Sequence, residues 1–352
     1  MEGRWLLSGQ LMLVRFFRAD NKNASRKGRE RMRRAFIAIC LILLAASSAA
    51  AADPFPSRPI TIIVGLAAGG VSDVMTRIYA ASASRTLGQT IVIENRPTGS
   101  GAVAANALQA AAPDGYTLLV FPISQHASIP AMDPNVTYDP LKGNTPVTLL
   151  FSIATLVVVP ADSPVNTLDD LKALAIKKSG GLNIGSPGLG TPAHLSGAKL
   201  MSAVKAPVTF VHYRGAPPMM SDLLPGRLDA AVVSSLTAKP FLLDHRIKAI
   251  VTDGTEKWAV APQIPMLKDM GLASAGLASW FGLAAAPGTP KEIVDKLNKA
   301  FVAAAKDPEV RAKIEDSGLT VVTSSPEEME RMMVADTADI DKLVHALDLR
   351  KK

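Results

Sequence analysis

The stretch that most constrains this chain is residues 60–73, Ile-Thr-Ile-Ile-Val-Gly-Leu-Ala-Ala-Gly-Gly-Val-Ser-Asp, which indicates a buried strand, a tight turn and a helix start. Residues 60–64 are all β-branched, and all but Thr61 are apolar, as expected for a strand covered on both faces. Gly69 and Gly70 allow a sharp turn, and Ser72 or Asp73 can cap the helix. Such a turn points backbone N–H groups and a positive helix end at one place, where we expect a carboxylate to bind.

A later stretch repeats this arrangement. Residues 182–185 predict a strand, residues 186–194 (Ser-Pro-Gly-Leu-Gly-Thr-Pro-Ala-His) a second glycine turn, and a helix follows to about residue 204. Elsewhere strands and helices alternate, which is typical of a mostly parallel sheet covered on both faces. Residues 122–146, rich in Pro, Asn and Asp, indicate a long surface connection. Two such turns suggest two similar lobes facing each other across a ligand cleft.

Basic residues are concentrated at the start of the chain. Residues 1–52 contain ten Lys or Arg and three Asp or Glu, and the whole chain has 38 and 31, so residues 53–352 carry 28 of each. A chain that is neutral beyond its leader gives no reason to expect nucleic acid as a partner.

The first 52 residues contain a pattern typical of a secretory signal. Met32-Arg33-Arg34 is followed by an apolar run, residues 35–44, and then by small residues up to Ala52. The run is too short for a membrane span, so we expect cleavage near Ala52 and export. Translation begins at Met1 or at Met32, and the sequence leaves both open.

The cysteine and histidine content argues against thiol and metal chemistry. Cys40 is the only cysteine and lies within the signal, so the exported chain has no disulfide, no cysteine nucleophile and no thiolate metal site. The five histidines are scattered singly. We therefore expect no metal site and no cofactor.

The signatures of common α/β enzymes do not occur in the sequence. We find no Gly-x-Ser-x-Gly elbow, no phosphate-binding Gly-x-x-x-x-Gly-Lys-Ser/Thr loop, and no full Gly-x-Gly-x-x-Gly fingerprint after the first strand. We expect no catalytic residue and no enzymatic activity, with a secreted α/β enzyme as the weaker alternative. Trp280 and Phe281, in an apolar strand, are expected to lie in the core.

Several segments together carry a family likeness. They are residues 55–60 (Phe-Pro-Ser-Arg-Pro-Ile), 68–73 (Ala-Gly-Gly-Val-Ser-Asp), 94–97 (Glu-Asn-Arg-Pro) with Gly99 and Gly101, 113–119 (Pro-Asp-Gly-Tyr-Thr-Leu-Leu), 188–195 (Gly-Leu-Gly-Thr-Pro-Ala-His-Leu), 213–215 (Tyr-Arg-Gly), 222–229 (Asp-Leu-Leu-Pro-Gly-Arg-Leu-Asp), 279–283 (Ser-Trp-Phe-Gly-Leu) and 287–290 (Pro-Gly-Thr-Pro). In this order and spacing, residues 53–352 resemble the substrate-binding proteins of tripartite tricarboxylate transporters, also called Bug receptors.

The resemblance implies a fold, a location and a function. The fold is a two-lobed α/β periplasmic-binding-protein fold (Venus flytrap, type II-like) with a ligand cleft between the lobes. Residues 1–52 would be the leader, residues 53–153 plus 252–352 the first lobe, and residues 154–251 the second. The function would be that of a monomeric periplasmic receptor, which binds a small carboxylated molecule and delivers it to membrane subunits of a secondary transporter. A periplasmic sensor that signals to a membrane partner is the alternative.

The resemblance also implies ligand-binding residues, mainly in the two glycine turns. Carried onto this chain, the predicted contacts are Ala67, Ala68, Gly69, Gly70 and Asp73 in the first lobe and Ser186, Gly188, Gly190, Thr191 and His194 in the second. Ser124, Gln125 and Ser234 are further pocket candidates.

The chain departs from the family pattern at the first turn. The family usually has Pro-Phe-Ala-Pro-Gly-Gly there, whereas this chain has Gly-Leu-Ala-Ala-Gly-Gly over residues 65–70. Where many members carry Asp-Asn, this chain has Val233-Ser234. A receptor without that acidic group has less with which to hold an ammonium group, so we expect a plain or aromatic carboxylate as ligand and not an amino acid.

Overall fold

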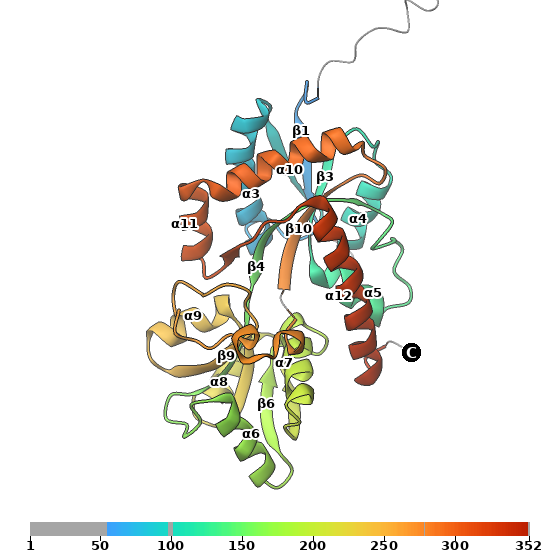
Figure 1. Cartoon of the computed structure of the whole chain (residues 1–352). Helices are drawn as coiled ribbons and strands as arrows, with labels where there is room; N and C mark the ends of the chain where they lie inside the picture. Colours follow the sequence, from blue (N-terminus) through green and yellow to red (C-terminus); the bar gives the residue numbers. More distant parts are fainter. Residues whose placement is uncertain (1–54, 98–100, 278, 351–352) are drawn as a thin grey trace, which may run out of the picture. The chain divides into compact units, whose positions relative to one another are not determined.

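The computed structural model of the chain describes residues 55–97, 101–277 and 279–350. The expected signal peptide lies outside the described residues, and its cleavage stays a prediction. The described residues form two mixed sheets with helices, an α/β architecture (Figure 1). Within these ranges no helix is both long and apolar enough to cross a membrane.

The first sheet combines strands from both ends of the described chain. Its strand order is β11-β4-β10-β3-β1-β2. β1 pairs in parallel with β2 and β3, whereas β10 pairs antiparallel with β3 and β4. The strands are β1 (Ile60–Val64), β2 (Ile91–Asn95), β3 (Thr117–Pro122), β4 (Thr145–Ile153), β10 (Ser279–Ala285) and β11 (Thr320–Val321). Four of the five residues of β1 are buried, which confirms the predicted buried strand.

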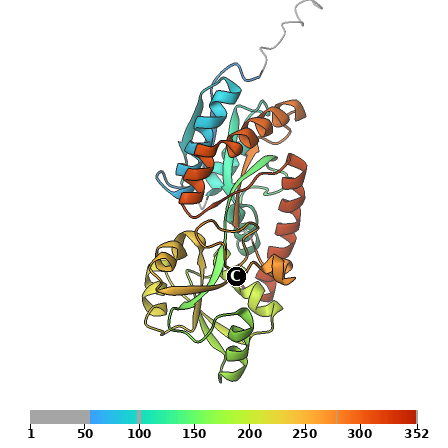
Figure 2. The ribbon, with the colours of Figure 1, turned by 60° about the vertical axis from the view of Figure 1, so that its left-hand side comes forward.

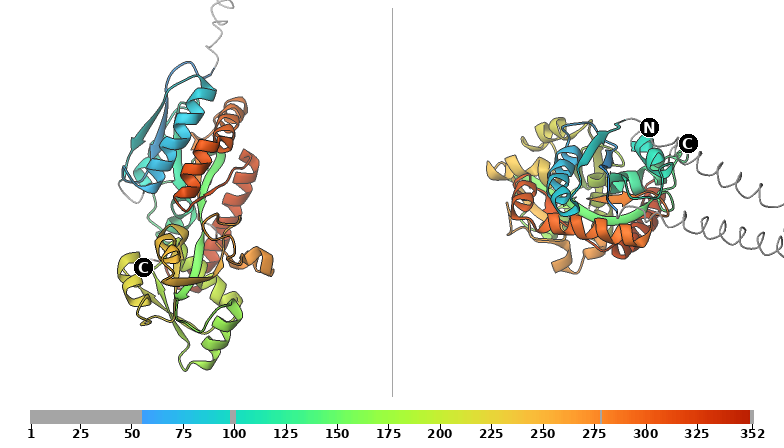
Figure 3. Two further views of the ribbon diagram at one scale, coloured as in Figure 1. Left: turned by 90° about the vertical axis from the view of Figure 1, so that its left-hand side faces the viewer. Right: turned by 90° about the horizontal axis from the view of Figure 1, so that it is seen from above.

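Helices pack on both faces of the first sheet. α3 (Val71–Leu87), α10 (Lys291–Lys306) and α11 (Pro308–Asp316) share one apolar core, which contains the buried rings of Tyr79, Phe151 and Phe301. α4 (Ala102–Gln109) and α12 (Pro326–Ala346) share the core of the other face with Trp280, so that residue is core as predicted. Figure 3, seen from above, shows α10 in orange along one side of the sheet.

The second sheet is built from the middle of the chain. Its order is β7-β6-β8-β5-β9, with β6 parallel to β7 and β8 and with β5 antiparallel to β8 and β9. The strands are β5 (Thr155–Pro160), β6 (Leu182–Ser186), β7 (Val208–His212), β8 (Ala230–Ser234) and β9 (Ile247–Thr252). The predicted second strand and glycine turn therefore correspond to β6 and the loop after it.

Two pairs of helices cover the second sheet (Figure 2). α6 (Leu168–Lys177) and α7 (Pro192–Ala203) share one apolar core, whereas α8 (Ala216–Leu223) and α9 (Ser235–Leu243) share the other. Thr167 caps α6 through a hydrogen bond from the Asp170 N–H group.

The chain passes twice between the sheets. β4 ends at Ile153 and β5 begins at Thr155, so a single residue separates them. The return from β9 to β10 runs through residues 253–278, which include the short helices η4 (Leu267–Met270) and η5 (Ala273–Ala275). We propose that the lobe boundaries lie at these passages, with residues 53–153 plus 252–352 as lobe 1 and residues 154–251 as lobe 2.

One prediction about the first sheet is wrong. Residues 122–146 are not simply a surface connection, because they contain η3 (Ser124–Ser128), α5 (Ile129–Met132) and the start of β4. Gln125 and His126 are buried, and the His126 ring nitrogens lie 3.1 Å from the Pro140 carbonyl oxygen and 2.9 Å from that of Met333. Polar side chains can be buried where they find hydrogen-bond partners, which composition does not reveal.

Candidate ligand-binding site

The first glycine turn joins β1 to α3 and has an internal hydrogen-bond pattern. Gly69 has a left-handed φ of 78°, and the Gly70 N–H group donates to the Ala67 carbonyl oxygen at 3.2 Å. Gly70 is the N-cap of α3 and provides no side chain, so the prediction that Ser72 or Asp73 caps this helix is wrong. Asp73 lies in the first helical turn, and its carboxylate accepts the Gly69 N–H group at 2.9 Å.

Asp73 is an ionised group at this turn. Its side chain is 5% exposed and lies 2.9 Å from the Arg77 guanidinium. Burial by itself would raise the pKa of Asp73, but hydrogen bonds from Arg77 and from the Gly69 N–H group outweigh it and leave the pKa lowered. The first turn therefore contains a carboxylate of its own, held by the N–H group that we expected to serve a ligand.

The second glycine turn joins β6 to α7. Gly190 has a φ of 72°, and the Thr191 N–H group donates to the Gly188 carbonyl oxygen at 3.3 Å. Thr191 is the N-cap, since its hydroxyl accepts the His194 N–H group at 3.3 Å. The Gly190 N–H group donates to Nδ1 of His194 at 3.1 Å.

His194 has the position in the second turn that Asp73 has in the first. It is 3% exposed, and burial, with a smaller contribution from His212, lowers its pKa to about 4. His194 is therefore neutral at physiological pH, and its Nδ1 atom can accept a hydrogen bond. The two turns have the same backbone hydrogen bonds but differ in the charge of the side chain that accepts the glycine N–H group.

Ser186, at the end of β6, belongs to a cluster with two histidines. It is paired in register with His212 of β7, and its hydroxyl lies 2.7 Å from Nδ1 of His212. The His194 and His212 rings are 4.5 Å apart and nearly perpendicular. His212 was missed by sequence reasoning, because the strand register that places it beside Ser186 and His194 is not readable from spacing.

The remaining candidates have structural contacts of their own. Gln125 donates to the Gly101 carbonyl oxygen at 3.1 Å, and a Cβ atom on Gly65 would lie 3.2 Å from its Oε1 atom, so Gln125 adjoins the base of the first turn. Ser124 is partly buried in η3. The Ser234 hydroxyl caps α9 by accepting the Thr237 N–H group at 3.2 Å. A contact of these residues with ligand stays a prediction.

The second turn adjoins the first lobe. A Cβ atom on Gly190 would lie 2.4 Å from the Met132 sulfur at the end of α5. Leu195, next to His194, is fully buried in the core that contains Trp280 and Ile123. The start of α7 is thus packed against the lobe that carries the first turn.

A carboxylate joins both chain crossings to α7. Asp253 accepts the Thr155 N–H group and the Ser196 hydroxyl, each at 2.6 Å, and also the Leu277 N–H group. Burial raises the pKa of Asp253 to about 6, because these hydrogen bonds only partly offset the loss of hydration. The helix that begins at the second turn is therefore attached to the segments on which the lobes would move.

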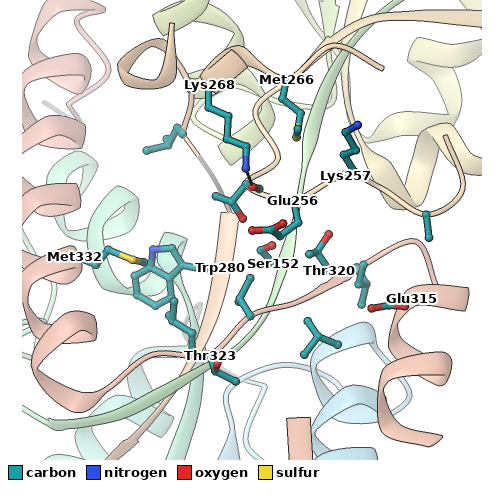
Figure 4. A pocket seen from close by; sticks show the side chains of 18 of the residues that line it. Ser152, Glu256, Lys257, Met266, Lys268, Trp280, Glu315, Thr320, Thr323 and Met332 are labelled. Carbon is teal, nitrogen blue, oxygen red and sulfur yellow. Dashed lines mark hydrogen bonds between the residues drawn. The ribbon is translucent and has the colours of Figure 1, made fainter. Parts of the chain in front are cut away.

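A cavity of about 1050 Å³ lies beside the crossing strands (Figure 4). Its lining contains none of the predicted ligand residues. It includes Ser152 of β4, Trp280 of β10 and several residues between Thr255 and Asp269. β11, which also lines it, is on the edge of the first sheet opposite to β1 and β2. Sequence reasoning gave no indication of this cavity.

The charges of this cavity do not favour an anion. Its cationic residues are Lys199, Lys257, Lys268 and Arg311, and its acidic residues are Glu256, Asp269, Glu315 and Asp336. Lys199 donates to the Gly276 carbonyl oxygen, Lys268 to that of Thr255, and Arg311 pairs with Glu315. Three of the four cations are engaged in this way, and the lining contains as many acidic as basic residues, which leaves little net attraction for a carboxylate.

A metal centre is not indicated in the part of the chain that the structure describes. No group of three or more His, Asp or Glu side chains there could hold a metal ion.

Residues 75–349 match the family model of the tripartite tricarboxylate transporter family receptor. A relative from Cupriavidus necator, a UPF0065 protein from the gbd 5′ region, is 36% identical over 276 residues, which cover 77% of this chain and 82% of the relative.

Solved structures give the same family. A TctC solute-binding protein from Polaromonas without ligand has a TM-score of 0.77 at 26% identity, covering 83% of this chain and 99% of that one. MatC from Rhodopseudomonas palustris with bound malate has a TM-score of 0.62 at 31% identity, covering 82% of this chain and 100% of that one. Another protein of that organism, with adipate, has a TM-score of 0.65 at 30% identity, covering 83% of this chain and 97% of that one.

Proposed function

Because the chain belongs to the tripartite tricarboxylate transporter family of receptors, whose members are periplasmic solute-binding proteins and not enzymes, we propose that it binds a small carboxylate in the periplasm and delivers it to the membrane subunits of such a transporter. The leader would direct export and be cut near Ala52. The receptor would act as a monomer, without cofactor.

The observation that carries the proposal is the pair of matching glycine turns. Each ends a parallel strand, contains one left-handed glycine and begins a helix, α3 in one lobe and α7 in the other. Helix starts of this kind favour anions, and the crevice beyond the strand ends is where α/β sheets bind ligands. Relatives of similar fold hold malate and adipate, both dicarboxylates.

The strength of such a site is sufficient for a receptor. A micromolar complex needs about 8 kcal/mol, whereas a helix end contributes about 0.3–1 kcal/mol and a hydrogen bond to a charged group about 1.5–3 kcal/mol. Three or four such bonds with two helix ends reach the required value after ordering costs. A carboxylate contacted from both lobes would then favour the closed arrangement.

We infer that the lobes have the ligand-free arrangement here. The TM-score is higher with the ligand-free Polaromonas protein than with the malate and adipate complexes, although these two are closer in sequence. A cross-lobe contact supports this inference: Ser235 of α9 donates to the Gly318 carbonyl oxygen, near the β11 edge, at 2.7 Å. In this interpretation ligand binding rotates the second lobe about the two crossings.

A thermal-shift panel tests the function. Purified protein from residue 53 onward is heated with mono-, di- and tricarboxylates, aromatic acids and amino acids. A ligand at 100 times its dissociation constant stabilises by about 2.7 kcal/mol, which is visible as a rise in Tm. We expect carboxylates to raise the Tm, and adipate and malate are the first to try. A folded protein whose Tm no acid changes would contradict the proposal.

A further inference from the structure

The cluster of Ser186, His194 and His212 contains a histidine for which the proposed function has no role yet. Parallel pairing of β6 and β7 puts Ser186 opposite His212, each as the last residue of its strand. Both residues therefore lie at the edge of the sheet where the second glycine turn begins. This is the edge of the sheet where a ligand is expected to bind.

The two histidines differ in what they can offer a ligand. His194 is buried, and its Nδ1 atom must be unprotonated to accept the Gly190 N–H group. Its role is to hold the turn. His212 is exposed, and Ser186 engages only its Nδ1 atom. The Nε2 atom of His212 is therefore the imidazole nitrogen suited to meet a ligand group from the cleft.

The surroundings of His212 decide its charge. Its contacts in the described structure are Ser186 of β6, the neutral His194 ring of α7 and, at 6.4 Å, the stacked Phe210 ring of its own strand. Partial loss of hydration lowers the pKa of His212 below its ordinary value, which favours the neutral ring at pH 7 when no ligand is bound.

The charged groups nearest along the chain do not supply an acid for His212. Asp222 of α8 is engaged by the Tyr213 hydroxyl at 2.7 Å and by Arg227 at 2.8 Å, and Arg214 adds a positive charge two residues after His212. A carboxylate that approached Nε2 would therefore be the first negative partner of this ring among the described contacts. An opposite charge at hydrogen-bond distance favours the protonated imidazole.

We propose that His212 is a specificity-determining residue, whose Nε2 atom binds a carboxylate of the ligand and takes up one proton from solvent as the ligand binds. The inference rests on the proposed function and refines it, because it assigns this carboxylate to the second lobe. A ligand whose second charge lies there would bind more tightly as the pH falls from 8 to 6.

Calorimetry tests the proton uptake directly. Adipate and malate are titrated into the protein at pH 7 in buffers with different ionisation enthalpies, so that the buffer dependence of the heat gives the number of protons taken up. We expect uptake approaching one proton per bound acid, and an affinity that falls several-fold for each unit of pH between 6 and 8.

Two variants make the test specific. His212→Asn keeps a group that can hydrogen-bond Ser186 but does not titrate, so we expect the uptake to disappear and the affinity at pH 6 to fall about tenfold. His345→Asn, which changes an exposed histidine near the end of α12, should keep both values of the unchanged protein.

The outcomes separate the two proposals. Binding of either acid without proton uptake, or an uptake that persists in His212→Asn, overturns the role of His212 and leaves the receptor function standing. If neither these acids nor any other carboxylate of the thermal panel binds, the receptor function fails and the role of His212 fails with it.

Discussion

The two glycine turns share one backbone conformation and hydrogen-bond pattern but differ in charge. Positions 67, 69, 70 and 73 of the first turn have the same hydrogen bonds as positions 188, 190, 191 and 194 of the second. In the first turn the glycine N–H group meets the ionised Asp73, and in the second it meets the neutral His194. A helix start thus attracts an external anion less where the chain supplies an anion of its own.

Packing also distinguishes the turns. Residues 66–70 are exposed, whereas Gly190 is buried against Met132. The first turn therefore has fewer packing contacts to hold its conformation than the second, which its neighbours fix. We infer that the second turn contributes more to anion affinity, and the following experiments test this asymmetry.

The largest effect is expected from Gly190→Ala, with Gly69→Ala as its matched control. Both residues have positive φ, which costs about 1 kcal/mol for alanine. A Cβ atom on Gly190 would also meet the Met132 sulfur at 2.4 Å, whereas one on Gly69 meets no atom within 4 Å. Calorimetry with adipate should show an affinity loss of at least about tenfold for Gly190→Ala and less for Gly69→Ala. Equal losses of affinity in the two variants would contradict the proposed difference between the two turns.

The next effect concerns the attachment of each helix. In α7 the Ser196 hydroxyl donates to the Asp253 carboxylate at the chain crossings. In α3 the Ser82 hydroxyl donates to the Asp307 carboxylate, at 2.9 Å, within the same lobe. Because the folded pKa of Asp253 is about 6 and the unfolded value about 4, its contribution to stability falls as the pH rises from 4 to 6 and is constant above.

Asp253→Asn should remove that dependence, which is at most about 3 kcal/mol. Denaturant unfolding at pH 4, 5, 6 and 7 measures it, with Asp307→Asn as the control at the first helix. A stability profile that keeps its slope between pH 4 and 6 in Asp253→Asn would contradict the assignment.

Asp73→Asn makes the first turn resemble the second. The lowered pKa of Asp73 means that its charge stabilises the fold above the unfolded pKa of about 4, and that this contribution is lost as the pH falls through the folded value. The variant should be about 1 kcal/mol less stable at pH 7 by denaturant unfolding, and the difference from the unchanged protein should shrink as the pH falls below about 4.

The same variant should bind adipate about threefold more tightly at pH 7, because a negative charge is removed from one wall of the cleft. Weaker binding would mean that Asp73 assists the ligand directly.

The smallest effect is expected at the contact between Ser235 and Gly318. Ser235→Ala removes one cross-lobe hydrogen bond of the ligand-free arrangement, worth about 0.5–1.5 kcal/mol. At about 0.5 kcal/mol, the lower end of that range, affinity for adipate should rise about two- to threefold, although Ser235 is not among the predicted ligand residues. Ser221→Ala, which removes a hydroxyl bonded within its own helix, is the control and should leave affinity unchanged. A fall in affinity for Ser235→Ala would refute the ligand-free assignment.

Local signals predicted much of the fold. The apolar run of β1 and the two glycine turns are encoded by neighbouring residues, and the structure contains them. The cap of α3 was predicted wrongly, because Gly70 can begin a helix without a side chain while Asp73 bonds backward to Gly69. Two candidate caps within one turn could not be ranked from spacing.

The site was less predictable than the fold. The pairing of Ser186 with His212 depends on the register of β6 and β7, and the burial of Gln125 and His126 depends on carbonyl groups far along the chain. Such contacts join residues that no sequence window contains. For the same reason, the role of Asp253 at the crossings has no local signature.

The way in which the first sheet is assembled has a consequence for biogenesis. β10 pairs with both β3 and β4, so these earlier strands lack their partner until the chain near residue 280 is available. The second sheet, in contrast, is made from one continuous segment. During the proposed export the second lobe can fold as soon as it emerges, while the apolar strands of the first lobe stay unpaired until the chain is nearly complete. That interval is when this protein is most exposed to aggregation and proteases.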